Sequence, residues 1–155
     1  MKRKLRGLKR TAIQLDFDLY RVDVPIRGLA DVPRLVADAR DAGLDVSLFA
    51  DSSPDDLPAR VDLASYRIVQ EALTNVIKHA GPEPAAEVRL TRADRVLTIE
   101  VTDRGSGHST LPGSGQGLVG MQERAALLGG SFEAGPRAEG GFRVLARLPI
   151  ERDPS

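Results

Sequence analysis

The sequence contains no cysteine and only two histidines among its 155 residues. The absence of cysteine excludes disulfides, thiolate metal sites and a cysteine nucleophile, and two histidines argue against a histidine-rich metal site. No apolar run approaches the roughly eighteen residues that a membrane-spanning helix needs, and no secretory signal is visible. Basic and acidic residues are equal in number, 22 of each, so bulk attraction to nucleic acid or to a membrane is not indicated. We expect a soluble, cytoplasmic domain.

Apolar residues make up 41% of the chain, which is enough for one hydrophobic core. Charge is uneven, because "MKRKLRGLKR" places six cationic residues among the first ten and no acid. We therefore divide the chain into a basic N-terminal segment (1–25), a main domain (26–150) and a tail (151–155). The basic segment is interpreted as a solvated tail or the end of a longer helix, and a weak nucleic-acid or lipid contact is the alternative.

Strand-like alternation of apolar and polar residues recurs along the chain, in segments 13–19, 45–50, 86–103, 131–135 and 141–150. The longest of these segments contains two strands joined by a tight turn near Ala93, and the last two segments form a hairpin. Helices interrupt the strands without strict β-α-β alternation. This order predicts an α+β fold, a two-layer sandwich with helices on one face of a mixed, mostly antiparallel sheet.

Three helices are predicted between the strands. The first lies within residues 28–45, with Asp31 as its N-terminal cap and Gly43 as its terminator. The longest runs from about Asp62 to Ala80. The third follows a glycine-rich stretch and has one apolar side, formed by Leu118, Met121, Ala125 and Leu128.

The longest helix carries the first candidate chemistry. Its apolar stripe comprises Leu63, Tyr66, Val69, Leu73, Val76 and Ile77. A second, polar stripe has a spacing of four and comprises Arg67, Glu71, Asn75 and His79, with Lys78 one position away. A solvated charged face is one interpretation. The other is a site for a hydrated magnesium ion and phosphate oxygens, because an amide oxygen, waters and phosphates suffice for magnesium.

The strand "RVLTIEVTD" ends in a carboxylate on its apolar face. Leu97, Ile99 and Val101 point to one side, and parity places Asp103 on that same side. A buried carboxylate costs free energy unless it is paired or binds something. It either caps the following turn or accepts a hydrogen bond from an exocyclic amine such as that of adenine.

Glycines follow this carboxylate in two groups. Gly105 and Gly107 would let the backbone pass close to a flat base. Gly115 and Gly117 precede a helix, where unpaired N–H groups face an anion. The pattern fits neither a Walker loop nor the dinucleotide fingerprint. Residues 107–115 between the groups lack apolar periodicity and are expected to form a mobile lid.

The ordered combination of these parts strongly resembles the ATP-binding catalytic domain of bacterial sensor histidine kinases, in the superfamily shared with gyrase, MutL and the large heat-shock chaperones. "YRIVQEALTNVIKHA" resembles the N box of that family, "DRGSG" its first glycine box and "GQGLVGMQERAALLGG" its second. The wording is most similar to the subfamily of nitrate and desaturase sensors. The resemblance covers about residues 29–150 and implies a Bergerat-type ATP-binding fold.

For the N box, the resemblance implies that Asn75 coordinates Mg²⁺ while Glu71 orients water or a metal ligand. Lys78 and His79 would approach the phosphates of ATP. Glu71, Asn75 and Lys78 are thus the implied catalytic residues.

For the glycine boxes, the resemblance implies that Asp103 accepts from the adenine amino group. Gly105 and Gly107 would line the base. The N–H groups presented to the phosphates would be those of Gly115, Gly117 and Leu118.

The implied activity is transfer of the γ-phosphate of Mg-ATP to a histidine on a separate dimerisation domain, with a response regulator downstream. His79 and His108 both lack the context of a phosphoacceptor, so the chain is expected to be an excised catalytic domain, in which the basic segment is the remnant of a dimerisation helix, or a standalone ATP-binding protein. An anti-sigma serine kinase and a binding module without transfer activity are the alternatives. The fragment is placed in the cytoplasm, as in the cytoplasmic part of a membrane-bound sensor. Phe142 stands where many relatives have a threonine near the adenine, which predicts a lost side-chain contact to the base.

Overall fold

The computed structural model describes residues 27–51, 56–79, 81–104 and 115–150. The elements in chain order are η1 (Leu29–Asp31), α2 (Val32–Asp41), β1 (Asp45–Asp51), α3 (Ala59–His79), β2 (Ala85–Ala93), β3 (Val96–Asp103), α4 (Gly115–Leu127), β4 (Ser131–Pro136) and β5 (Phe142–Pro149). The predicted strand at 13–19, the basic segment and most of the predicted lid lie outside the described residues.

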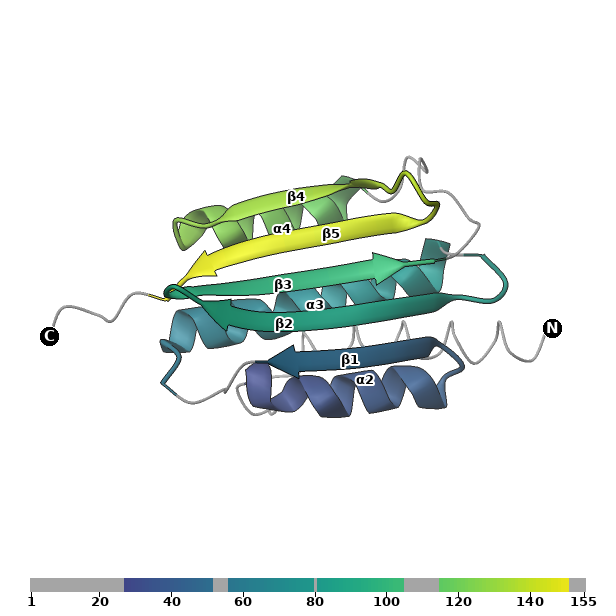
Figure 1. Ribbon diagram of the computed structural model, residues 1–155, viewed down its shortest axis with the longest axis horizontal. Helices are drawn as coiled ribbons and strands as arrows, with labels where there is room; N and C mark the ends of the chain where they lie inside the picture. Colours follow the sequence, from purple (N-terminus) through teal and green to yellow (C-terminus); the bar gives the residue numbers. More distant parts are fainter. Residues whose placement is uncertain (1–26, 52–55, 80, 105–114, 151–155) are drawn as a thin grey trace, which may run out of the picture.

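The strands form one five-stranded sheet in the order β1-β2-β3-β5-β4. β1 and β2 are parallel, and the other three neighbouring pairs are antiparallel. The helices lie behind the sheet in Figure 1 and leave its front face open. The predicted α+β sandwich with a mostly antiparallel sheet is therefore confirmed.

The core lies between the sheet and the helices. Alternate residues of the central strands point toward the helices and are buried, among them Val88, Leu90, Leu97, Ile99, Val144, Ala146 and Leu148. From the helices, the same core receives Val36, Val69, Leu73, Met121 and Ala125. Every second side chain of the strands and one side of each helix thus form a single apolar layer between the sheet and the helices.

The N-terminal helix prediction needs a correction. A short 3₁₀ turn, η1, precedes α2, and the Asp31 side chain does not cap α2. Its Oδ2 instead accepts a hydrogen bond from the Gly28 N–H at 2.9 Å. Asp62, on α3, accepts from the Leu29 N–H through Oδ1 at 2.7 Å. Two carboxylates therefore satisfy the start of η1, and one of them comes from a distant helix.

Two turn predictions are confirmed by the backbone. Gly43, which follows the C-cap residue Ala42 of α2, has φ of 105°, the left-handed conformation that ends a helix. Asp94 and Arg95 join β2 to β3 with φ of 52° and 63°. Two successive left-handed residues are typical of the tightest hairpin turns, whose twist matches that of the strands.

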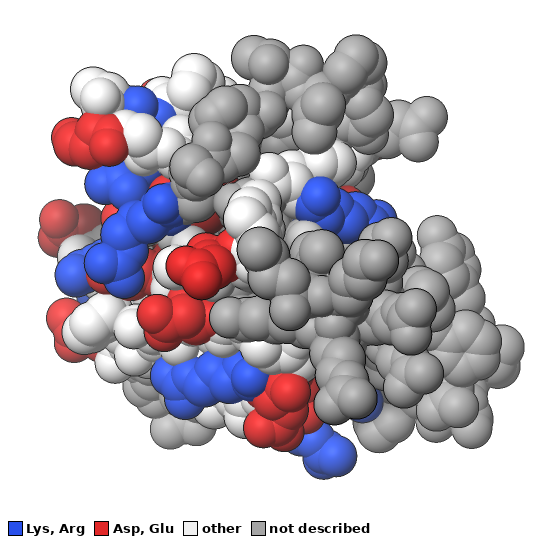
Figure 2. Space-filling view, turned by 90° about the vertical axis from the view of Figure 1, so that its right-hand side faces the viewer, with Lys and Arg blue, Asp and Glu red and all other residues white. Residues whose placement is uncertain are grey.

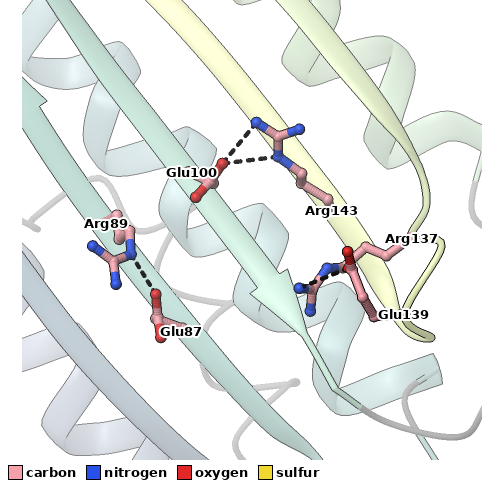
Figure 3. Close-up of polar contacts among 6 residues, drawn as sticks. All are labelled: Glu87, Arg89, Glu100, Arg137, Glu139 and Arg143. Carbon is pink, nitrogen blue, oxygen red and sulfur yellow. Dashed lines mark hydrogen bonds and ion pairs between the residues drawn. The ribbon is translucent and has the colours of Figure 1, made fainter.

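The open face of the sheet is covered by charged side chains of both signs. Figure 2 shows them gathered at the left, on the side formed by this face. Arg143 on β5 binds Glu100 on β3 at 2.8 Å, and Arg89 pairs with Glu87 along β2 (Figure 3). The Arg89 guanidinium also lies 4.7 Å from the ring centre of Phe49. Exposed pairs of this kind stabilise little individually, but they keep this face of the sheet polar.

Candidate functional site

Helix α3 carries the predicted polar stripe. The helix buries Tyr66, Val69, Leu73, Val76 and Ile77. Glu71 and Asn75 lie one turn apart on another side and are half-buried. Leu63 was expected in the apolar stripe, and that expectation is wrong. It is only half-buried and lines a groove between α3 and α4 instead.

The start of α4 lies directly against this polar stripe. A Cβ atom added at Gly117 would be 2.6 Å from Glu71 Oε1, and 3.3 and 3.4 Å from Asn75 Nδ2 and Oδ1. Glycine at this position is what allows the helix to approach the two side chains. Since α4 begins at Gly115, its first-turn N–H groups and the positive end of its dipole lie beside the carboxylate and amide of α3. This juxtaposition suits an anion held together with a cation.

Asp103 ends β3 on the helix-facing side, as parity predicted. The residue is 8% exposed, whereas Leu97 and Ile99 on the same face are fully buried. A neighbouring glycine, which the sequence analysis did not single out, shapes its surroundings. Gly141 has φ of +83°, and a Cβ there would collide with the Asp103 carbonyl oxygen and lie 3.1 Å from Oδ1. The glycine pair before the last strand, 140–141, is the signal that could have identified it.

Phe142 lies beside this carboxylate. Thr102 pairs with Arg143, so the next residues along the two strands, Asp103 and Phe142, are neighbours. Phe142 is partly buried and packs against the core. An aromatic ring, rather than a hydroxyl group, therefore stands next to Asp103 on the helix-facing side of the sheet.

Lys78 and His79 form the last turn of α3. The Lys78 side chain is exposed and that of His79 is half-buried. Burial, and secondarily the neighbouring Lys78 charge, lower the pKa of His79 below its usual value. The lowered pKa favours the neutral form of the His79 imidazole. The predicted contact of His79 with phosphates stays a prediction.

These features meet at one end of the molecule. Figure 1 shows that α3 and β3 both end, and α4 begins, at the right-hand end of the view. The structure brings Glu71, Asn75 and Gly117 into one cluster and places Asp103 at the same end of the sheet. Leu118 follows in the first turn of α4 and packs partly against the core. The predicted Gly105 and Gly107 lie outside the described residues.

The fold and this cluster define a class: an α+β domain in which the start of a helix faces an amide and a carboxylate. Residues 61–152 match the family described as histidine kinase-, DNA gyrase B- and HSP90-like ATPases. The match covers more than half of the chain, and the chain therefore belongs to this family. ATP is accordingly its ligand class.

Curated relatives point to one branch of the family. The sensor histidine kinase YxjM of Bacillus subtilis is 39% identical over 110 residues, which cover 70% of this chain and 27% of YxjM. The oxygen sensor histidine kinase NreB of Staphylococcus carnosus is 33% identical over 111 residues, 70% of this chain and 32% of NreB. The predicted catalytic domain of the sensor-histidine-kinase type is confirmed. The chain spans about a third or less of the length of these relatives.

Solved structures support the same fold. The histidine kinase domain of the blue-light-activated kinase from Erythrobacter litoralis EL346 has a TM-score of 0.63 at 18% identity, covering 78% of this chain and 64% of that one. The catalytic domain of histidine kinase ThkA has a TM-score of 0.61 at 13% identity, covering 81% of this chain and 96% of that one. In the described part of the chain, no helix has the length and apolarity to cross a membrane.

Proposed function

We propose that this domain binds Mg-ATP at the cluster of Glu71, Asn75 and the start of α4, and transfers the γ-phosphate to a histidine on a separate dimerisation domain. In this step the bond between the γ-phosphorus and the β–γ bridging oxygen breaks, a phosphorus–nitrogen bond forms on the histidine, and ADP leaves. A response regulator would then take the phosphoryl group from the histidine. The reaction would take place in the cytoplasm.

The observation that carries the proposal is the contact between Gly117 and the polar stripe. It sets the N–H groups of α4 opposite Glu71 and Asn75, so phosphate oxygens between the two helices would meet donors on one side and metal-ligating oxygens on the other. Phosphoryl transfer depends mainly on such positioning and charge stabilisation. Lys78 would add a cation at the end of α3.

The residues fit a magnesium ion bound jointly with phosphates. Asn75 and Glu71 offer hard oxygen ligands side by side, and the described ranges hold no cluster of three or more acidic, histidine or cysteine side chains. Magnesium commonly uses one or two protein oxygens and takes the rest from phosphates and water. When bound, it would neutralise charge on the phosphate oxygens.

We assign the base to the opposite side of the site. Asp103 would accept from the adenine amino group, because its carboxylate ends the apolar row of β3 at the end of the sheet where α4 begins. Gly105 and Gly107 would line the base, and Gly115, Gly117 and Leu118 would present N–H groups to the phosphates. The Phe142 ring beside Asp103 would supply apolar contact where a hydroxyl contact is missing.

Calorimetric titration tests the binding site. Asn75→Ala should abolish Mg-dependent ATP binding while circular dichroism shows an intact fold. Asp103→Asn keeps an acceptor but removes the charge, so it should weaken ATP by up to about tenfold, the difference between a hydrogen bond to a charged and to a neutral acceptor, and should affect inorganic triphosphate less, because only ATP carries the amine. Unchanged affinity in Asn75→Ala, or equal losses of ATP and triphosphate in Asp103→Asn, would contradict the respective assignment.

Radiolabelled ATP tests the transfer. With a sensor-kinase dimerisation domain added, we expect acid-labile label on histidine. Acid-stable label on a serine of a partner protein would instead favour the serine-kinase alternative, and binding without any transfer would favour a nucleotide-binding module.

A further inference from the structure

A second concave surface lies between α3 and α4, away from the cluster that holds Asn75. It has a volume of about 420 Å³ and is lined by Arg60, Leu63, Ala64, Arg67, Arg124, Leu127 and Leu128. We call this surface the arginine groove. It lies along the first half of α3 and the last turn of α4.

The arginine groove combines an apolar floor with charge of one sign. Three of its seven lining residues are arginines and none is acidic, although the whole chain has no net charge. Leu127 is 84% exposed, more than any other large apolar side chain in the described ranges. An exposed leucine in a concave surface lined by arginines indicates a contact surface rather than an ordinary solvated face.

The shape of the groove fits a helix. α3 and α4 run in opposite directions beside each other (Figure 1), and the groove between two such helices accepts the apolar ridge of a third. Arginines at the rim would face the flanking side chains of that third helix. Charge complementarity requires those side chains to be acidic. The basic segment of this chain, with six cations in its first ten residues, has the wrong sign for the role.

The groove and the nucleotide cluster lie on the same side of α3, about two helical turns apart. Arg67, Glu71 and Asn75 follow one another on the same side of α3 at intervals of four residues. Eight residues of helix separate Arg67 from Asn75, which corresponds to about 12 Å. A helical partner seated in the groove would therefore extend to the phosphate end of the site within about two turns.

We infer that the arginine groove docks an acidic, amphipathic helix of the protein that receives the phosphoryl group. This inference rests on the proposed function. The docked helix would hold its apolar ridge on Leu63, Leu127 and Leu128, and its carboxylates on Arg67 and Arg124. Docking at one end of α3 would bring the accepting histidine to the nucleotide at the other end.

The test uses the full 155-residue chain and two matched fluorescent peptides. Both peptides are helical, about 20 residues long, with leucines at heptad positions; one carries glutamates beside the leucines and the other lysines. Fluorescence anisotropy should show the acidic peptide binding at least about tenfold more tightly. Arg67→Glu/Arg124→Glu should weaken the acidic peptide by about ten- to a hundredfold and strengthen the basic one.

A control variant, Arg34→Glu/Arg147→Glu, makes the same change of charge at exposed arginines elsewhere and should leave the preference for the acidic peptide intact. Leu127→Ala should weaken both peptides. Equal binding of the two peptides by the wild-type chain, or unchanged binding by Arg67→Glu/Arg124→Glu, would overturn the inference. So would a concentration-dependent dimer, seen by analytical ultracentrifugation, that the Leu127 variant abolishes, because the groove would then bind a second copy.

Calorimetry with Mg-ATP separates this inference from the proposed function. Leu127→Ala and the single variant Arg124→Glu should bind the nucleotide as the wild type does, because neither residue belongs to the polar stripe of α3. If Asn75→Ala leaves ATP binding intact, the nucleotide assignment fails whatever the peptides do. If ATP binding behaves as proposed and the peptides do not discriminate, the groove assignment fails alone.

Discussion

Gly117→Ala should weaken nucleotide binding while leaving the stability of the fold nearly unchanged. The new Cβ would lie 2.6 Å from Glu71 Oε1, which is too close for a non-bonded contact. That oxygen ends a flexible side chain, so the carboxylate can turn away at a cost of about 1 kcal/mol for a distorted rotamer. Alanine in a helix is favoured over glycine by up to about 1 kcal/mol. The two effects nearly cancel, and the free energy of unfolding should change by less than about 1 kcal/mol.

Nucleotide binding has no such compensation. The displaced Glu71 carboxylate and the methyl group, 3.3–3.4 Å from the Asn75 amide, would both enter the space assigned to phosphate and magnesium. We expect Mg-ATP affinity to fall at least about tenfold, which is 1.4 kcal/mol. Calorimetry gives the affinity, and urea melts followed by circular dichroism give the stability.

Gly120→Ala is the matched control. Gly120 lies in the same helix, and its added Cβ would approach only Arg124 Nη1, at 3.3 Å. It should gain similar helix propensity and bind ATP normally. Wild-type affinity in Gly117→Ala would show that the start of α4 does not form the phosphate site. A loss of several kcal/mol in stability would show that Glu71 is held rigidly.

Three further predictions concern neighbouring features. Gly141→Ala should destabilise the fold by more than about 2 kcal/mol in urea melts, because φ of +83° and the rigid Asp103 carbonyl leave no room for a side chain; a stable variant would contradict this packing. Asp62→Ala should cost about 1–2 kcal/mol by removing the 2.7 Å bond to the Leu29 N–H, and Asp62→Asn, which keeps an acceptor, should cost less; equal losses would refute the capping role. Because the pKa of His79 is lowered in the folded chain, the unfolded chain takes up the proton first, and stability should fall as the pH drops below about 6.5. His79→Gln should have a smaller loss between pH 7.5 and 5 than the wild type, and identical pH profiles would contradict the shift.

The sequence predicts those parts of the site that depend on local periodicity. Alternation along β3 placed Asp103 on the buried face, because successive side chains of a strand point to opposite faces of the sheet. Spacing by four placed Glu71 and Asn75 on one side of α3 for the same kind of reason. The resemblance to a known family added the roles of these residues.

Contacts between distant elements were beyond such reasoning. Nothing local to Gly117 indicates that Glu71 lies against it, and Gly141 meets Asp103 only because β5 pairs with β3. Asp31 was predicted to cap the helix that follows it, but its carboxylate accepts from the Gly28 N–H instead, and the contact of Asp62 with the Leu29 N–H could not be predicted because it comes from α3. Leu63 fits the apolar stripe of α3 by spacing, yet the groove beside α4 leaves it half-exposed. In each case the contact depends on how distant elements pack against each other, and the periodicity of a single segment carries no information about that packing.

Helix α3 is an unbroken rod of 21 residues with neither glycine nor proline. Sharp bends in helices arise at such residues or at local irregularities of the hydrogen bonding, so a tilt applied at Arg60 is carried to Asn75 instead of being absorbed between them. The helix is about 30 Å long and therefore works as a lever: a few degrees of rotation at its first turn displace the amide at the other end by an ångström or more. A partner bound at the first turn of α3 would therefore also determine the position of the Asn75 amide.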